Sequence, residues 1–461
     1  MLNRIYAEEA IGIAMSTGAD FAEIFFEVTR NGGITLIDNK IDSVADNTIT
    51  GVGIRAFLGT RTVYGSTSDT TREGLVMCAR AVAEAMGDFG EDTPSITLKP
   101  MEIQNIPTVK TPPLSSDIKQ RCDLHREACY VASEYDKRIA QVQGNITGVE
   151  REICIANSEG LFVTDRQTRT RMAVNAVASS DGENQSGRCS PGRSMGLETF
   201  ELFPPREIGK TAAAQAITNL EADYCPAGEM TVAIENGFGG VIFHEACGHS
   251  LEATSVGVGV SQMCGKLGEK IANEKVTAID DGTVKNAWGS VNVDDEGTPT
   301  RRNVLIENGV LKSYMIDRLG SRRMGMKMTG SGRRESYLYE PTSRMTNTFI
   351  DNGPDKNEDI IASIEYGLYA KSMGGGSVNP LTGAFNFAVT EGYIVRNGKI
   401  CEAVRGASLI GTGSDILQNI AMVGQNLDVG QGMCGSSSGS VPTDVGQPLI
   451  RVSKITVGGR K

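Results

Sequence analysis

Apolar positions near the start of the chain repeat every three or four residues, and further on they repeat every second residue. The first pattern, at residues 2–17, predicts a helix that stops near Gly18. The second is typical of half-buried strands. Four strands are predicted, at residues 21–30, 34–41, 48–58 and 62–66, with turns at 31–33 and 59–60. Apolar residues at helical spacing from Leu75 to Met86 predict a second helix.

A similar order of elements follows a proline-rich, extended connection. It comprises a helix around 115–136, strands between 138 and 182, and an Ala-rich helix at 205–220. We therefore assign residues 1–225 to an N-terminal α+β domain of β-meander and helices. Its two similar halves, 1–100 and 114–222, suggest a diverged duplication. The alternative is a common arrangement repeated by chance, because no residue-level repeat accompanies it.

The remainder, residues 226–461, has short apolar runs separated by Gly, Thr and Ser. A strand at 231–235 leads through a glycine-rich turn into a short helix, and the best later helix is at 357–366. The pairs Asn308-Gly309 and Asn397-Gly398 are typical of hairpin turns. The predicted fold class is therefore α+β, with a C-terminal, mainly antiparallel β domain built around that short helix.

Charge and composition narrow the classes of function. The net charge of −11 argues against direct nucleic acid binding, which needs a concentrated basic face. The arginines at 166, 169 and 171 alternate with polar residues as on a solvated strand face. We expect no membrane span, since no apolar run is long enough, and we expect a cytoplasmic location. The ten cysteines form no C-x-x-C pair, so most are expected to be buried free thiols.

Two of the three histidines, His244 and His249, stand five residues apart, and Glu245 follows the first. A catalytic zinc ion takes about three protein ligands and keeps one position open. The histidines can supply two ligands, and a glutamate beside them can act as general base on the attacking water and then as general acid to the leaving amine. The segment therefore indicates a zinc peptidase site with Glu245 as the catalytic residue.

The spacing of these histidines differs from the four residues of H-E-x-x-H. Five residues on an ideal α-helix rotate a side chain by roughly 140°, which would separate the two imidazoles. We predict a distorted helix, with a local π-type widening that Gly248 makes less costly. The alternative is a pair of packed core histidines. The third histidine, His125, is interpreted as a surface or packing residue.

Read together with its surroundings, this segment resembles the TldD/PmbA (TldD/TldE) family of metallopeptidases, specifically its catalytic TldD-type branch. The similarity is loose at residues 48–55 and dense from 231 onward. The matching blocks are His244-Glu245-Ala246 with Gly248-His249 and Leu251-Glu252, Asp294-Asp295-Glu296-Gly297-Thr298-Pro299, Gly332-Arg333-Arg334-Glu335-Ser336-Tyr337, Arg344-Met345-Thr346-Asn347-Thr348 and Gly432-Met433-Cys434-Gly435.

The resemblance implies a third zinc ligand. In this family a cysteine near the C-terminus completes the site, and Cys434 is the matching residue. Glu252 is the competing candidate, since carboxylates serve this role in other zinc peptidases. We prefer Cys434, with Glu252 orienting an imidazole. Cys247, inside the motif, is interpreted as a packing residue. The expected cofactor is one zinc ion (Zn²⁺), held by His244, His249 and Cys434.

The family further implies dimers that enclose the metal, as a homodimer or as a heterodimer with a TldE/PmbA-type paralogue. Such a site admits unfolded peptide or protein substrates, held through strand-like pairing of their backbone. An alternative function is a non-catalytic binding or regulatory protein with structural zinc, as in the family's older label of DNA gyrase modulator. An intact Glu245 argues against it.

Other clusters have roles that the sequence leaves open. The pair Arg333-Arg334 could bind a substrate carboxylate or an oxyanion, or form a structural salt bridge with Glu335. The acidic run at 294–296 could be a turn, a substrate-amine site or a fold element. The glycine-rich stretch at 374–377 is more typical of a close-packed or flexible loop than of a phosphate site.

Overall fold

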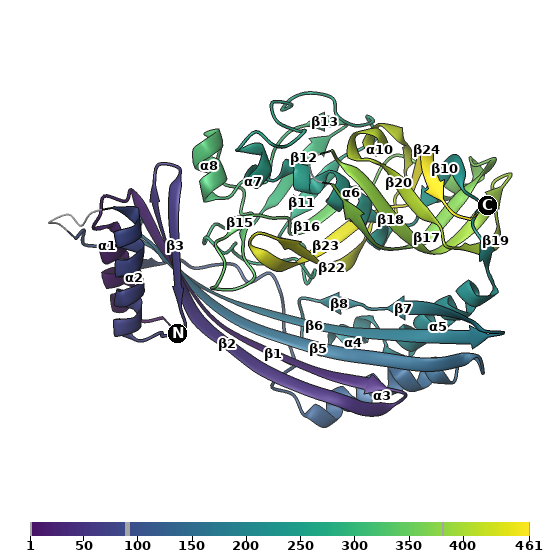
Figure 1. The fold of residues 1–461 in the computed structure, drawn as a ribbon, viewed down its shortest axis with the longest axis horizontal. Coiled ribbons are helices and arrows are strands. Elements are labelled where there is room, and N and C mark those ends of the chain that lie inside the picture. Colours follow the sequence, from purple (N-terminus) through teal and green to yellow (C-terminus); the bar gives the residue numbers. More distant parts are fainter. Residues whose placement is uncertain (1, 88–92, 380–381, 461) are drawn as a thin grey trace.

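The N-terminal part of the chain forms one long, curved sheet (Figure 1). The computed structural model describes residues 2–87, 93–379 and 382–460. The strands follow the order β3-β2-β1-β5-β6-β4, and β7 and β8 also pair with β6. They are β1 (Phe21–Ile37), β2 (Lys40–Leu58), β3 (Arg61–Thr67), β4 (Lys99–Pro100), β5 (Ile139–Asn157), β6 (Leu161–Ser180), β7 (Glu183–Cys189) and β8 (Gly192–Arg193).

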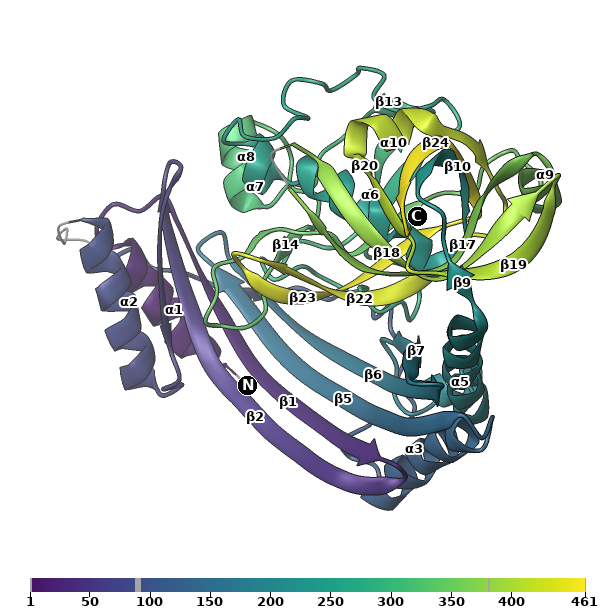
Figure 2. The same cartoon turned by 45° about the vertical axis from the view of Figure 1, so that its right-hand side comes forward.

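Helices from both predicted halves pack at the two ends of this sheet (Figure 2). They are α1 (Arg4–Met15), α2 (Arg72–Met86), α3 (Ile118–Ser133), α4 (Thr199–Leu202) and α5 (Pro205–Glu221). Side-chain caps fix several helix starts; the Asn3 side chain, for example, accepts a hydrogen bond from the backbone N–H of Ile5. Because β1 pairs with β5 along most of its length, both halves share one sheet.

The predicted turn at residues 31–33 is wrong, because β1 continues straight through it. The glycine there serves close packing: a Cβ on Gly32 would lie 2.5 Å from the Leu114 side chain. The chain turns instead at Asp38 and Asn39, whose φ angles of 47° and 62° suit a tight hairpin.

The remaining chain folds over the concave face of this sheet (Figure 2). Its strands are β9 (Asp223–Tyr224), β10 (Gly228–Ile234), β11 (Ala278–Asp281), β12 (Arg302–Glu307), β13 (Val310–Leu311), β14 (Gly332–Arg333), β15 (Thr342–Ser343), β16 (Asn347–Ile350), β17 (Tyr366–Val378), β18 (Ala384–Arg396), β19 (Lys399–Arg405), β20 (Ser408–Thr412), β21 (Ile420–Val423), β22 (Asp428–Ser436), β23 (Gly439–Gln447) and β24 (Ile450–Gly458).

Short helices connect these strands. They are η1 (Gly237–Gly240), α6 (Val241–Ala246), η2 (Gly248–Leu251), α7 (Ala253–Val256), α8 (Arg318–Met324), α9 (Asn357–Ala362) and α10 (Gly413–Asn419). Most strand pairs are antiparallel, although β10 pairs with β17, β16 with β23, and β9 with β19 in parallel. The predicted α+β class is confirmed, as are the hairpin turns at Asn308 and Asn397, which have positive φ. The division at residue 225 stays a prediction.

The prediction that the arginines of β6 form a solvated face is wrong for Arg169, which is buried. Its Nε donates a 2.8 Å hydrogen bond to the Trp288 carbonyl. Burial, together with the nearby charge of Arg333, lowers the pKa of Arg169 to about 9. The reason is tertiary: the C-terminal part covers this face of the sheet, which a strand pattern cannot reveal.

Buried ion pairs join the sheet to the covering part. We call Glu23, Arg55, Glu296 and Arg334 the buried ion cluster. Arg55 Nη2 lies 2.9 Å from Glu23 Oε1 and also pairs with Glu296, while Arg334 Nη2 lies 3.1 Å from Glu23 Oε1. All four side chains are at most 1% exposed. The acidic run and one arginine of the sequence blocks are therefore fold elements.

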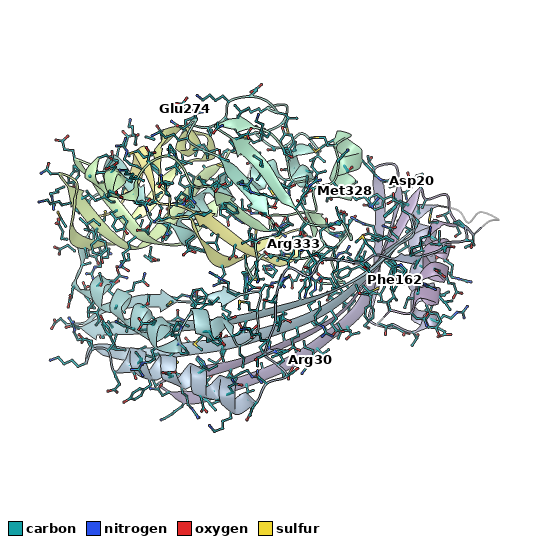
Figure 3. All side chains as sticks on the ribbon, turned by 180° about the vertical axis from the view of Figure 1, so that it is seen from behind. Asp20, Arg30, Phe162, Glu274, Met328 and Arg333 are labelled. Atoms are coloured by element: carbon teal, nitrogen blue, oxygen red, sulfur yellow. The ribbon has the colours of Figure 1, made fainter. Side chains whose placement is uncertain are left out.

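The neighbours of this cluster support the same conclusion. Asp295 pairs with Arg151 of β5 at 3.2 Å, and Asp294 accepts backbone hydrogen bonds from Glu296, Thr298 and Gly332. Arg333 donates to the carbonyls of Met345 and Pro442, both at 2.7 Å. Figure 3 shows Arg333 where the covering part meets the long strands. Among the ion pairs of the described residues, neither Arg333 nor Arg334 pairs with Glu335, so of the alternatives left open by the sequence this salt bridge is not observed; Arg334 pairs with Glu23 instead.

Candidate metal centre

The two histidines lie on two short helices rather than on one. His244 is in α6, which ends at Ala246, and His249 is in the 3₁₀ turn η2. Between them, Cys247 has φ −128° and ψ −45°, outside helical geometry. The predicted distortion is present, but as a break and not as the expected π widening.

The break has a packing cause. A Cβ on Gly248 would lie 2.4 Å from the Met345 sulphur, so only glycine lets this turn approach the segment between β15 and β16 so closely. Cys247 is fully buried, and burial raises the pKa of its thiol. Its sulphur faces the Gly413 carbonyl at 3.5 Å. The interpretation of Cys247 as a packing residue agrees with this environment.

Cys434 reaches the histidines from a distant hairpin. It lies on β22, which pairs with β23, and is buried. Its sulphur is 3.2 Å from His244 Nε2 and 3.2 Å from His249 Nε2. One ligand atom from each of the three residues lies within 4.8 Å of the other two. The fold thus brings the Cys434 thiol to the two imidazoles, although His244 and His249 lie 190 and 185 residues before it in the chain.

These atoms fit a zinc ion. Zinc–sulphur bonds of about 2.3 Å and zinc–nitrogen bonds of about 2.0–2.1 Å, at tetrahedral angles, would place sulphur and nitrogen about 3.5 Å apart. The observed 3.2 Å separations are close to that value. Two imidazoles and a thiolate are also a donor set that zinc prefers.

The histidines favour the thiolate form of Cys434. Burial by itself opposes ionisation of this thiol, but the charge and hydrogen bond of His244, and then those of His249, outweigh it and lower the Cys434 pKa to about 4. Burial also disfavours a charged His249, but the Glu252 carboxylate and Cys434 raise the His249 pKa well above its ordinary value. The pocket is thus suited to an ionised sulphur.

Glu252 lies behind His249, away from Cys434. Its Oε2 is 3.1 Å from His249 Nδ1, the ring nitrogen opposite the one that faces Cys434. The geometry therefore favours Glu252 as the group that orients the imidazole, and Cys434 as the third ligand.

Arg344 is a residue of this site that the sequence reasoning did not assign. Its fully buried guanidinium donates to the Cys434 carbonyl and, at 3.0 Å and 2.9 Å, to Ser438 Oγ and the Gly439 carbonyl. Its Nε lies 3.9 Å from Glu252 Oε1. One side chain thus touches both the β22–β23 hairpin and the partner of His249. The sequence signal that could have identified Arg344 was its position in the block 344–348, which resembles the family.

Glu245 is more exposed to solvent than the three candidate metal ligands. Its side chain is 30% exposed, and its Oε2 lies 3.7 Å from His249 Nε2, the nitrogen that faces Cys434. A carboxylate here borders the metal position while staying accessible from outside. By contrast, His125 lies in α3, fully buried against Gly144, as a packing residue.

Comparisons with known proteins cover most of the chain. Family models match residues 22–85, 111–220 and 227–459 as domain 1, the central domain and the C-terminal domain of PmbA/TldA metallopeptidases. The chain is 35% identical to the Metalloprotease TldD homolog of Haemophilus influenzae, covering 95% of this chain and 93% of that protein. It is 32% identical, over 56% of this chain and 58% of that protein, to the Zinc metalloprotease TldD homolog of Saccharolobus solfataricus.

Solved structures share the fold. The crystal structure of TldE from Thermococcus kodakarensis superposes with a TM-score of 0.78 at 20% identity, covering 98% of this chain and 100% of that chain. Among the described residues, no helix is both long and apolar enough to cross a membrane. Family models, sequence identity and fold agree: the chain belongs to the PmbA/TldD family of metallopeptidases.

Proposed function

We propose that this metallopeptidase is zinc-dependent and hydrolyses unfolded peptides or proteins. His244, His249 and Cys434 would hold the zinc ion, and Glu245 would act as general base and then general acid. The observation that carries the proposal is the convergence of Cys434 on the two imidazoles beside an accessible carboxylate. The name of the Saccharolobus solfataricus relative also supports zinc.

The roles follow from chemistry. When bound by three protein ligands, zinc acts as a Lewis acid that activates water and polarises a carbonyl. Glu245 removes the proton from the attacking water and delivers it to the leaving amine. Glu252 holds Nδ1 of His249, which leaves Nε2 free for the metal. Arg344 fixes the Cys434 backbone through its carbonyl.

A substrate has a strand edge available beside these residues. Within the described sheet, β22 is the terminal strand and pairs with β23 alone. Apart from the Gly432 and Cys434 carbonyls, which accept hydrogen bonds from Trp288 Nε1 and Arg344, β22 can offer backbone groups on its other edge to an extended peptide. Backbone pairing recognises no particular side chain and needs an extended segment, so it suits unfolded substrates.

The assembly is part of the proposal. We propose a homodimer, or a heterodimer with a TldE/PmbA-type paralogue, on the strength of the family resemblance and the shared fold of TldE. The cytoplasmic location stays a prediction.

The competing function is a regulatory or binding protein with a structural zinc ion. Structural zinc sites are usually closed by four protein ligands and need no base. Here three candidate ligands converge, and Glu245 borders them with an exposed carboxylate. This arrangement favours catalysis.

Glu245→Gln tests the proposal. We expect the variant to keep its zinc, measured by elemental analysis, and to lose peptide hydrolysis by a factor on the order of 10²–10⁴. Glu274→Gln is the matched control, because Glu274 is an exposed glutamate at the outer edge of the molecule (Figure 3). Hydrolysis by Glu245→Gln at the wild-type rate would refute a catalytic role for this residue.

A further inference from the structure

A groove separate from the metal ligands lies between the two parts of the molecule. Its cavity volume is about 800 Å³. One wall comes from β6, β7 and α5, and the other from β17 and the first residues of β22. It extends as far as Met433, which directly precedes Cys434. Because β22 carries both a wall of the groove and a metal ligand, a chain lying along β22 would reach the groove.

Arg171 and Arg188 give one wall of the groove a positive charge. No ion pair joins either of them to a carboxylate in the described part of the chain. Arg171 is half-buried, and burial followed by the charge of Arg188 lowers its pKa to about 10. Its Nη2 contacts Ser190 Oγ at 3.3 Å, whereas its buried Nε has no hydrogen-bond partner among the described residues. The two arginines therefore keep positive charge and N–H donors that can bind a ligand.

The other charged groups of the groove do not neutralise this pair. Arg193 stacks over the Phe203 ring at 4.7 Å and lies near the buried Asp444. Glu207 and Asp428 also line the groove, but neither forms an ion pair with its arginines. Three arginines thus face two carboxylates, so the groove has an excess of one positive charge among its lining residues.

The opposite wall allows a peptide backbone to come close. Gly374 and Gly375 of β17 line it, and a Cβ on Gly375 would meet nothing within 4 Å. Ser372 and Thr390, linked by a 3.0 Å hydrogen bond, add hydroxyl groups. The glycine stretch at 374–377, interpreted from the sequence as a loop, thus lies in strand β17 and borders open space across the groove from the arginines.

We propose that this groove holds acidic side chains of the substrate on one side of the scissile bond, with Arg171 and Arg188 as specificity-determining residues. The inference rests on the proposed function and names its substrate class: unfolded peptides with a run of Asp or Glu near the cleaved bond. A guanidinium with unused donors binds a carboxylate through charge-assisted hydrogen bonds, which are stronger than neutral ones.

Binding can be measured without turnover in zinc-loaded Glu245→Gln protein. The probes are two labelled, unstructured peptides of the same sequence, one with four Glu residues and the other with Gln at those positions, and fluorescence anisotropy gives Kd. We expect the Glu peptide to bind about tenfold more tightly at low salt, with the difference shrinking as salt screens the charges. Equal Kd values would overturn the inference.

Variants locate the effect. Adding Arg171→Gln and Arg188→Gln should remove the difference between the peptides, whereas adding Arg166→Gln should keep it. Arg166 lies on the same strand β6, but it is exposed, pairs with Glu152 and lines no part of this groove. If the double variant fails to fold, the single variant Arg188→Gln provides the test, because Arg188 is exposed and its replacement should not disturb folding. This substitution should reduce the difference in Kd between the two peptides severalfold. A full preference in either variant contradicts the inference.

The outcome also separates this inference from the proposed function. If wild-type protein cleaves neither peptide but the binding preference depends on the arginines, hydrolysis fails as the function and the acidic groove stands. If wild-type protein cleaves both peptides with equal kcat/KM and binds them equally, hydrolysis stands and the acidic groove fails.

Discussion

The metal centre and the buried ion cluster are both sets of ionisable side chains removed from water, but they are completed differently. In the ion cluster, Arg55 and Arg334 face Glu23 and Glu296, and no member is more than 1% exposed. In the metal centre, three potential ligands converge, and the adjoining Glu245 is 30% exposed. The ion cluster pairs its own charges and is closed, whereas the metal centre gathers three potential ligands and stays accessible beside Glu245.

This difference separates structural from functional charge. Buried charges that satisfy one another hold two parts of a fold in register, and removing one leaves the others unpaired. Three donor atoms directed at one point, with a side open to solvent, instead suit a metal and a reactant. Asp295, Glu296 and Arg334 lie in the first environment, although the sequence left open a role for their blocks in substrate binding.

Loss of the third ligand should have the largest effect. We expect Cys434→Ser to abolish stoichiometric zinc binding and peptide hydrolysis, since a neutral hydroxyl replaces a thiolate. Elemental analysis of protein purified under reducing conditions without chelators measures it. Cys247→Ser is the control, because that thiol lies inside the motif but faces the Gly413 carbonyl. Full zinc occupancy in Cys434→Ser would assign the third ligand to another residue.

Breaking the ion cluster should cost stability and leave metal binding intact. Arg55→Met would leave Glu23 and Glu296 buried without their shared partner, and we expect a loss of about 3–5 kcal/mol in the free energy of unfolding. Denaturant titration measures it. The control, Arg72→Met, breaks an exposed pair with Glu9 and should cost about 1 kcal/mol or less. Zinc loss from folded Arg55→Met protein would mean that the two regions are coupled.

His125 sharpens the comparison, since it is a buried titratable group whose ring nitrogens have no hydrogen-bond partner in the described part of the chain. Burial lowers its pKa to about 4 from 6.5, so the folded state holds it neutral while the unfolded chain takes up a proton below pH 6.5. Stability is therefore lost as pH falls from 6.5 towards 4. We expect this residue to contribute a loss of about 2 kcal/mol between pH 7 and pH 5.

Comparison with His125→Gln isolates that contribution, because glutamine does not titrate and all other groups are shared. Free energies of unfolding at several pH values should fall less steeply in the variant than in the wild type. Parallel curves would show that His125 protonates equally well in the folded state.

The smallest expected effect concerns Arg344, which acts on the metal centre only through the residues that it contacts. Arg344→Lys keeps the charge but loses the forked contact with the β22–β23 hairpin, and we expect zinc affinity to fall about 10-fold to 100-fold. Competition with a chelator measures it. Arg302→Lys, an exposed arginine paired with Asp351, is the control. Unchanged affinity in Arg344→Lys would make Arg344 a packing residue alone.

Local patterns predicted several helices and strands close to their observed positions. The helix at 205–220 is observed as Pro205–Glu221, and the strand at 48–58 lies within Lys40–Leu58. Failures occurred where tertiary contacts override local preference. Residues 31–33 continue a strand, with Gly32 packed closely against Leu114, and the helix predicted at 357–366 ends at Ala362 before β17 begins.

The sequence by itself determined the chemistry of the candidate site, since His244, Glu245 and His249 lie within six residues and their types and order define their roles. It could not place the third ligand from spacing, because any of ten cysteines was available and only the family resemblance selected Cys434. The β22–β23 hairpin sets that contact, through pairing and packing between segments far apart in the chain. In the ion cluster, Glu23 and Arg55 already pair across neighbouring strands of the sheet, but Arg55 reaches Glu296, and Glu23 reaches Arg334, only when the sheet is covered.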